Sequence, residues 1–64
     1  MILIKVREEG QVVAEYKSPV IPSKGEYVGN VFGLSQMIRG KVINIWHRFN
    51  GDEFSHIDVY LEVL

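Results

Sequence analysis

The stretch FSHIDVYLEVL, residues 54–64, decides the fold because it holds the clearest two-residue alternation in the chain. Branched aliphatic side chains alternate there with polar or aromatic ones, namely Ile57, Val59, Leu61 and Val63 with Asp58, Tyr60 and Glu62. This period predicts a β-strand with one dry face and one wet face. A strand with four aliphatic side chains on one face must lie across other apolar surface. We therefore expect the rest of the chain to form the sheet that receives it.

The length of the chain limits how it is stabilised. Its 64 residues predict one small domain, residues 1–64. A domain of this size buries only about 60% of the surface that its unfolded chain exposes. There is no cysteine, so no disulfide strengthens it. Dense packing of the apolar residues, which make up 47% of the chain, or assembly with other copies must do so.

Four further strands are indicated before the terminal one. Met1–Arg7 and Gln11–Lys17 alternate in hydrophobicity and flank Gly10, so they predict a hairpin. Residues 18–24 contain both prolines and predict a loop or an irregular edge. A strand then begins near Tyr27, and Gly29-Asn30 suggests a turn or a bulge within it.

The second half of the chain contains the strongest hairpin signal. Gly40–Phe49 is rich in β-forming residues, and Asn50-Gly51 is the dipeptide that most favours a tight hairpin turn into the terminal strand. In residues 31–39 neither the helical nor the strand period fits. A single helical turn over residues 34–38 and a loop that leads into a strand both remain open there.

These elements predict an all-β fold: a small, five-stranded, partly open antiparallel barrel with at most one short helical turn. The expected core consists of aliphatic side chains from all five strands: Ile2, Ile4, Val6, Val12, Val28, Val42, Ile45, Ile57, Val59 and Leu61.

Three segments carry a resemblance to a known class of proteins: PSKGEYV (residues 22–28), GKVINIWH (residues 40–47) and IDVYLEVL (residues 57–64). Their order resembles small SH3-like β-barrels, above all short barrel proteins of bacteria and their phages. The resemblance implies an SH3-like barrel that binds through its loops and one exposed sheet face. The chain lacks the Ala-Leu-Tyr-Asp-Tyr stretch and the paired tryptophans of peptide-binding SH3 domains. Recognition of proline-rich peptides and catalytic residues are therefore not implied.

The charge balance narrows the class of partner. Seven basic and eight acidic residues give a formal net charge of -1, and neither sign forms a long run. This composition weakens the case for a non-specific nucleic-acid binder, which usually has a basic excess. No apolar run approaches the ~20 residues of a membrane span, and Lys5 and Arg7 interrupt the apolar start where a signal peptide would continue. We expect a cytoplasmic protein without a membrane partner.

Candidate partner-binding residues gather around the second hairpin: Trp46, His47, Arg48, Phe49, His56, Asp58 and Tyr60. Aromatic residues beside an arginine suit a protein contact or the stacking of a base. Asp58 and Glu62 predict a solvated face around Tyr60. Trp46 and Phe49 could instead cover the end of a small core.

The same residues allow one metal hypothesis. His47, His56 and Asp58 could approach one another across the hairpin, but no fourth ligand is evident. We therefore predict no metal and no cofactor. The chain has no phosphate-binding glycine loop, no nucleophile elbow and no thiol, so we also predict that it is not an enzyme.

The function expected from the sequence is that of a non-catalytic binding module. Its partner would be a protein or another copy of the chain, bound through the C-terminal hairpin face. The alternative is a small barrel that binds nucleic acid or a nucleotide. For that class the resemblance to phage proteins suggests an inhibitor of a host protein or an oligomer that sequesters a nucleotide. A structural oligomer, formed through the edge of the terminal strand, is the third hypothesis.

Overall fold

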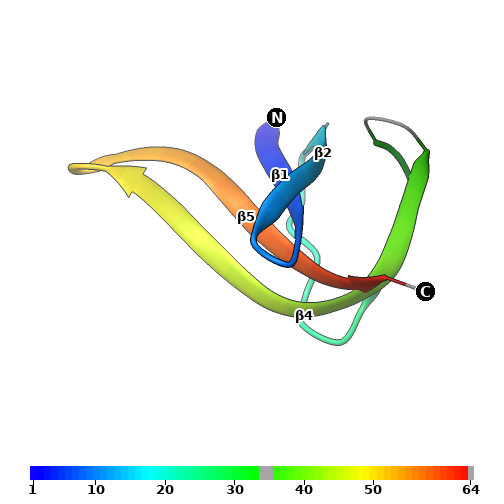
Figure 1. Cartoon of the computed structure of the whole chain (residues 1–64). Coiled ribbons are helices and arrows are strands. Elements are labelled where there is room, and N and C mark those ends of the chain that lie inside the picture. Colours follow the sequence, from blue (N-terminus) through cyan, green and yellow to red (C-terminus); the bar gives the residue numbers. More distant parts are fainter. Residues whose placement is uncertain (34–35, 64) are drawn as a thin grey trace.

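The computed structural model describes residues 1–33 and 36–63 and shows an all-β fold, as predicted. The described residues form five strands: β1 (Ile2–Glu8), β2 (Gln11–Ser18), β3 (Tyr27–Phe32), β4 (Met37–Asn50) and β5 (Glu53–Val63). They make one sheet in the order β2-β1-β5-β4-β3 (Figure 1). No helix occurs in the described ranges, so none crosses a membrane there. The helical turn considered for residues 34–38 begins outside the described residues, and Met37 and Ile38 already belong to β4.

Both predicted hairpins are present, and both turns contain residues with a positive φ. Glu9 and Gly10 join β1 to β2 with φ values of 52° and 83°. Gly51 follows β4 with a φ of 66° and leads through Asp52 into β5. The hairpin predicted from Asn50-Gly51 is present, but its two turn residues are Gly51 and Asp52, because Asn50 pairs with Glu53 at the end of the strands.

The prediction that all strands pair antiparallel is wrong for one pair. β5 lies between β4 and β1 and runs parallel to β1, with Ile57 beside Ile4 and Val59 beside Val6. This position gives the aliphatic face of β5 a neighbour on each side. Central strands of this kind bury more apolar surface than edge strands. The terminal strand is therefore the centre of the sheet.

β-Bulges change which residues face the core. An extra residue, Ile43, stands between the pairs Val42–Leu61 and Asn44–Tyr60. Val42 consequently faces the core and Ile43 is exposed, whereas simple alternation would put Ile43 on the same face as Ile45. A similar shift after Val6 leaves Val13, rather than Val12, packed against the core. The irregularity predicted at Gly29-Asn30 is also present, and Asn30 has a φ of 59°.

The core lies on the concave face of the sheet. Its buried hydrophobic residues are Ile4, Val6, Ala14, Val31, Ile38, Val42, Ile57, Val59 and Leu61. Three predicted core residues, Ile2, Val28 and Ile45, are half-buried against this cluster, and Val12 is not part of it. Ala14, Val31 and Ile38 were not predicted, because a small residue and an irregular segment give no clear period.

The two edge strands of the sheet meet at one point. An isolated antiparallel bridge joins Ala14 of β2 to Gly33, just after β3. A Cβ atom on Gly33 would lie 2.7 Å from both the Gln36 carbonyl oxygen and Cγ1 of Ile38, so only glycine fits this approach. The sheet therefore curls until its edges touch, and within the described ranges this bridge is where the two edges pair.

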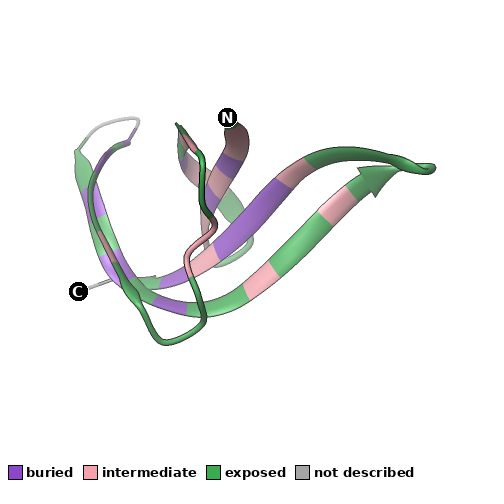
Figure 2. Cartoon of the chain, turned by 180° about the vertical axis from the view of Figure 1, so that it is seen from behind, coloured by how far each residue is buried: buried purple, intermediate pink, exposed green. Residues whose placement is uncertain are grey.

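The hairpin of β4 and β5 extends beyond the rest of the sheet (Figure 1). β1 pairs with β5 from Ile57 to Tyr60, so residues 48–56 pair only with each other among the described residues. We call the hairpin of residues 44–60, with this segment at its end, the arm. Its tip is exposed, whereas the part of β5 that follows it is buried (Figure 2). Residues 48–56, at the end of the arm, continue the sheet without the core that covers the rest of it.

Candidate functional site: the hairpin arm

The cross-strand register defines two faces of the arm. Trp46 pairs with Asp58, Arg48 with His56, and Asn44 with Tyr60. Directly paired residues lie on the same side of a sheet, so these three pairs share one face, which we call the outer face. His47 pairs with Ile57, a buried residue, and lies on the opposite side, the core face. β1 extends the outer face sideways, because Lys5 pairs with Asp58 and Arg7 with Tyr60.

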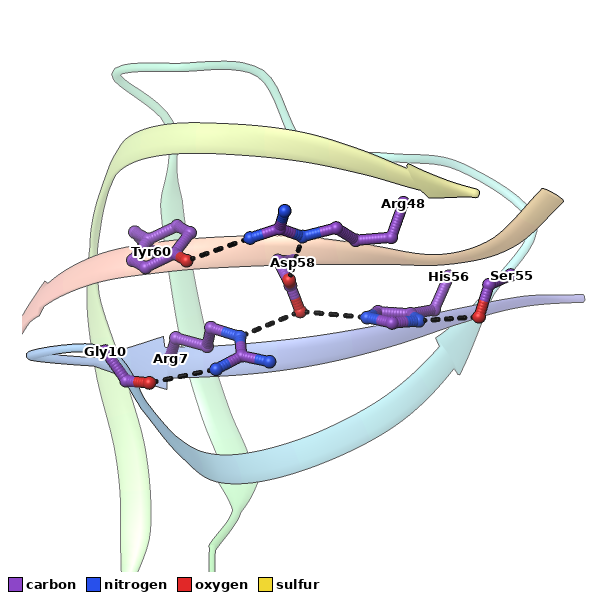
Figure 3. A network of polar contacts seen from close by, with 7 residues as sticks. All are labelled: Arg7, Gly10, Arg48, Ser55, His56, Asp58 and Tyr60. Atoms are coloured by element: carbon purple, nitrogen blue, oxygen red, sulfur yellow. Dashed lines mark hydrogen bonds and ion pairs between the residues drawn. The ribbon is translucent and has the colours of Figure 1, made fainter. Parts of the chain in front are cut away.

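Asp58 lies at the centre of the polar contacts on the outer face. It is fully buried, with 0% of its surface exposed, although simple alternation predicted a solvated position. The Arg48 guanidinium donates a hydrogen bond of 2.6 Å from Nε to Oδ2 of Asp58. Arg7 Nε lies 3.0 Å and His56 Nε2 3.2 Å from Oδ1, so basic side chains from three strands surround one carboxylate (Figure 3). These side chains cover Asp58 from solvent, and this explains why the prediction was wrong.

Arg7 and His56 contact Oδ1 of Asp58 without forming hydrogen bonds, whereas Arg48 forms a hydrogen bond to Oδ2. Arg7 Nε and His56 Nε2 are close to Oδ1, but neither has the alignment of a hydrogen bond. We regard Arg7–Asp58 as an ion pair, which lacks the directional part of a hydrogen bond. Other contacts hold the side chains of Arg7 and His56 in place. Arg7 donates from Nη1 to the Gly10 carbonyl at 2.9 Å, and Ser55 Oγ lies 2.9 Å from His56 Nδ1.

The surroundings of Asp58 lower the pKa of its carboxyl group. Burial by itself raises the pKa of a carboxyl group, but the hydrogen bond from Arg48 and the contacts with Arg7 and His56 outweigh burial and lower the pKa of Asp58. The hydrogen bonds to Asp58 and Tyr60 raise the pKa of Arg48. Asp58 is therefore ionised at neutral pH, and its charge holds the basic side chains in place.

Arg48 connects this network to the aromatic residues. Its Nη2 donates to the Tyr60 hydroxyl at 3.4 Å, and its Cζ lies 5.1 Å from the centre of the Trp46 ring. A guanidinium at this distance over an indole makes a cation–π contact. Trp46 remains 49% exposed. It is thus an ordered aromatic surface and not a buried cap of the core.

The core face of the arm carries a separate aromatic contact. Phe49 and Phe54 pair across the strands, and their rings meet edge to face with centroids 5.8 Å apart. Phe49 is 59% and Phe54 47% exposed, because the core does not reach this part of the arm. These two rings and Trp46 give the arm exposed apolar surface on both faces.

The structure brings together four of the predicted site residues and separates the others. Arg48, His56, Asp58 and Tyr60 form one network, and Trp46 lies beside it. His47 and Phe49 lie on the core face. His47 therefore does not approach His56 and Asp58, and among residues 1–33 and 36–63 no cluster of His, Cys, Asp or Glu has the arrangement of a metal site.

Arg7, Lys5 and Phe54 were missing from the predicted site. Arg7 is placed by the parallel pairing of β1 with β5, which alternation within either strand does not reveal. The available signal was that Lys5 and Arg7 share the wet face of β1. Phe54 was recognisable as an aromatic residue at the hairpin, and its pairing with Phe49 follows from the bulge at Ser55.

Comparisons with protein-family models, curated proteins and solved structures gave no match.

Proposed function

We propose that this protein is a non-catalytic binding module and that the arm is its contact surface for a protein partner. The exposed aromatic side chains of Trp46, Phe49 and Phe54, on a hairpin that extends beyond the core, are the observation that carries the proposal. Large aromatic residues exposed together on one element are typical of interaction sites.

The polar side chains on the outer face of the arm also suit a protein contact. Tryptophan, tyrosine and arginine are the residues most enriched among those that contribute strongly to protein binding. Trp46, Tyr60 and Arg48 adjoin one another here, and Asp58 restrains the arginine. A restrained side chain loses less conformational entropy on binding than a free one. The network thus supports recognition without a pocket or a cofactor.

We also propose that the fold is a partly open SH3-like barrel of the kind found in small bacterial and phage proteins. The meeting of the sheet edges at Ala14 and Gly33 supports a barrel, and the five strands in so short a chain support its size. The parallel pairing of β1 and β5 departs from a purely antiparallel barrel. A cytoplasmic location, expected from the composition, belongs to the same proposal.

Removal of the aromatic side chains of the arm should weaken partner binding. We expect Trp46→Ala and Phe54→Ala each to weaken it by about tenfold or more, because truncation of an interface aromatic often costs over about 1.4 kcal/mol. The measurement is the amount of protein that the immobilised chain retains from an extract, identified by mass spectrometry, and then the Kd for each retained protein.

Tyr27→Ala is the matched control, because Tyr27 is an exposed aromatic residue on β3, away from the arm. A partner lost by both arm variants and retained by the control supports the proposal. If Tyr27→Ala reduces binding as much as the two arm variants do, the contact surface has been misplaced.

One observation favours a second candidate, the binding of nucleic acid or a nucleotide. Lys5, Arg7 and Arg48 share this part of the outer face with two carboxylates, Asp58 and Glu15, so it has a formal excess of one positive charge on a chain of net charge -1. Trp46 would supply a stacking surface. Phosphate-driven binding falls steeply with rising salt, whereas an apolar protein contact does not. A salt titration of any retained partner therefore separates the two candidates.

A further inference from the structure

We infer that Asn50 is a site of spontaneous deamidation, a modification that converts its side-chain amide to a carboxylate and loosens the end of the arm. The inference goes beyond the proposed function and does not depend on it. It is carried by the position of Asn50 directly before Gly51, at the exposed tip of the hairpin of β4 and β5. A covalent change of this kind alters both the charge and the hydrogen-bonding groups of a residue.

The reaction needs only groups of Asn50 and Gly51 together with water. The backbone nitrogen of Gly51 loses its proton to the solvent and attacks Cγ of Asn50. The bond from Cγ to Nδ2 breaks, and Nδ2 takes up a proton and leaves as ammonia, so a succinimide ring joins the two residues. One water molecule then opens the ring. If the bond from the ring nitrogen to Cγ breaks, the product is aspartate; if the bond from the nitrogen to the main-chain carbonyl carbon breaks, the product is isoaspartate.

Gly51 leaves the attacking nitrogen accessible. It has no side chain to shield this nitrogen, and its backbone is freer to rotate than that of any other residue. Apart from its two chain neighbours, no heavy atom of the described residues lies within 4 Å of the position that a Cβ atom on Gly51 would occupy. Asn50 and Gly51 are both exposed, so solvent can remove the proton and supply the water.

The fold holds Asn50 only at the end of a strand. Asn50 is the last residue of β4, and its pair with Glu53 is the last pair before the turn. Its side chain makes no hydrogen bond within residues 1–33 and 36–63. The attack requires Asn50 to leave the extended backbone conformation, and opening of this one terminal pair allows that. Exposed chain ends and tips open locally at low cost, so the reaction can proceed while the sheet stays folded.

The other two asparagines of the chain, Asn30 and Asn44, do not share these features. They precede Val31 and Ile45, whose stiff, β-branched side chains crowd the nitrogen that would have to attack. Ile45 also donates its backbone N–H to Oδ1 of Asn44 at 3.0 Å, and this bond retains the proton that the reaction must remove. Asn30 and Asn44 are therefore internal controls for the reaction at Asn50.

Conversion of Asn50 changes the tip of the arm in two ways. Asn50 pairs directly with Glu53, so a carboxylate at position 50 stands opposite another carboxylate. Like charges directly opposite each other on paired strands are destabilising. Isoaspartate also lengthens the main chain by one carbon atom, which disturbs the register at the turn. The next pair along the hairpin, Phe49 with Phe54, should therefore open more often than it does in the unmodified protein.

Incubation of the purified chain in mildly alkaline buffer, followed by peptide mapping with mass spectrometry, tests the inference. The peptide that contains Asn50 should gain one mass unit, because OH replaces NH2, and should separate into an aspartate and an isoaspartate form. The peptides that contain Asn30 and Asn44 should keep their mass over the same period. Asn50→Gln is the matched control: it keeps an uncharged amide, but its longer side chain disfavours ring closure, so the mass gain and the release of ammonia should be lost.

A parallel incubation in urea gives the behaviour of the same asparagines in the unfolded chain. Conversion of Asn50 in the folded protein, ahead of Asn30 and Asn44, supports the inference. Conversion in urea alone would show that the hairpin protects Asn50 and would overturn it, as would conversion of all three asparagines at one rate. Amide hydrogen exchange tests the effect on the arm: residues 48–55 should exchange faster in Asn50→Asp than in Asn50→Gln, and equal exchange would contradict that effect.

Discussion

Replacement of Val59 by aspartate is expected to unfold the protein. Val59 is fully buried in the centre of the sheet, between Val6 on β1 and Ile45 on β4. A carboxylate there would lack any partner, and burying an unpaired charge costs several kcal/mol. A single core of this size rarely supplies more than about 3 to 5 kcal/mol of stability. Circular dichroism and amide chemical-shift dispersion should therefore both report an unfolded chain.

Val20→Asp is the control for this substitution. Val20 is 68% exposed in the segment between β2 and β3, so the same change of side chain there should leave the fold intact. A cooperative thermal transition of Val59→Asp near that of the wild type would show that β5 is not the centre of the core.

The second large effect is expected from Asp58→Asn. The asparagine has nearly the same size but no charge, and it would leave Arg7 and Arg48 facing each other without a counter-charge. Breaking a buried ion pair from one side typically costs about 3 to 5 kcal/mol. We expect about 3 kcal/mol here, because Arg48 is 42% exposed and can turn toward water. The free energy of unfolding in urea provides the measurement.

The loss of stability caused by Asp58→Asn should also become smaller as the pH falls. The pKa of Asp58 is lowered in the folded protein, so the unfolded state takes up its proton first as the pH falls. The stabilisation from the carboxylate is therefore complete above about pH 4, the ordinary range of an aspartate, and is lost as the pH falls through the folded pKa. The difference in stability between the wild type and Asp58→Asn should shrink in acid. Asp52→Asn removes the same charge in the exposed turn and is the control, with a free energy of unfolding close to that of the wild type at pH 7. Equal stability of all three proteins at pH 7 would contradict the role given to Asp58.

The strands were predictable from the sequence because each depends on a local signal. Alternation in residues 57–63 predicted the central strand, and Gly10 and Gly51 predicted the turns. The bulges were not predictable in the same way. One extra residue, such as Ile43, reverses the faces of everything beyond it, and nothing in the local pattern marks where it is inserted.

Local sequence signals also predicted only part of the candidate site. The hairpin brings Arg48, His56, Asp58 and Tyr60 together, so their proximity followed from the turn alone. The burial of Asp58 did not follow, because it depends on Arg7, which comes from the other end of the chain through a parallel pairing. Buried charges are rare unless paired, so alternation alone favoured a solvated Asp58. Contacts between distant strands determine the chemistry here.

Acrylamide quenching of the Trp46 fluorescence tests the role of the arm most directly. Trp46 is the single tryptophan of the chain and lies half-exposed on the outer face, so its emission reports that face alone. Acrylamide is neutral and should not be drawn to the basic side chains nearby. The quenching constant is predicted to fall on addition of any partner retained through the arm. An unchanged quenching constant while such a partner binds would show that the outer face stays open and would contradict the assignment of the arm as the contact surface.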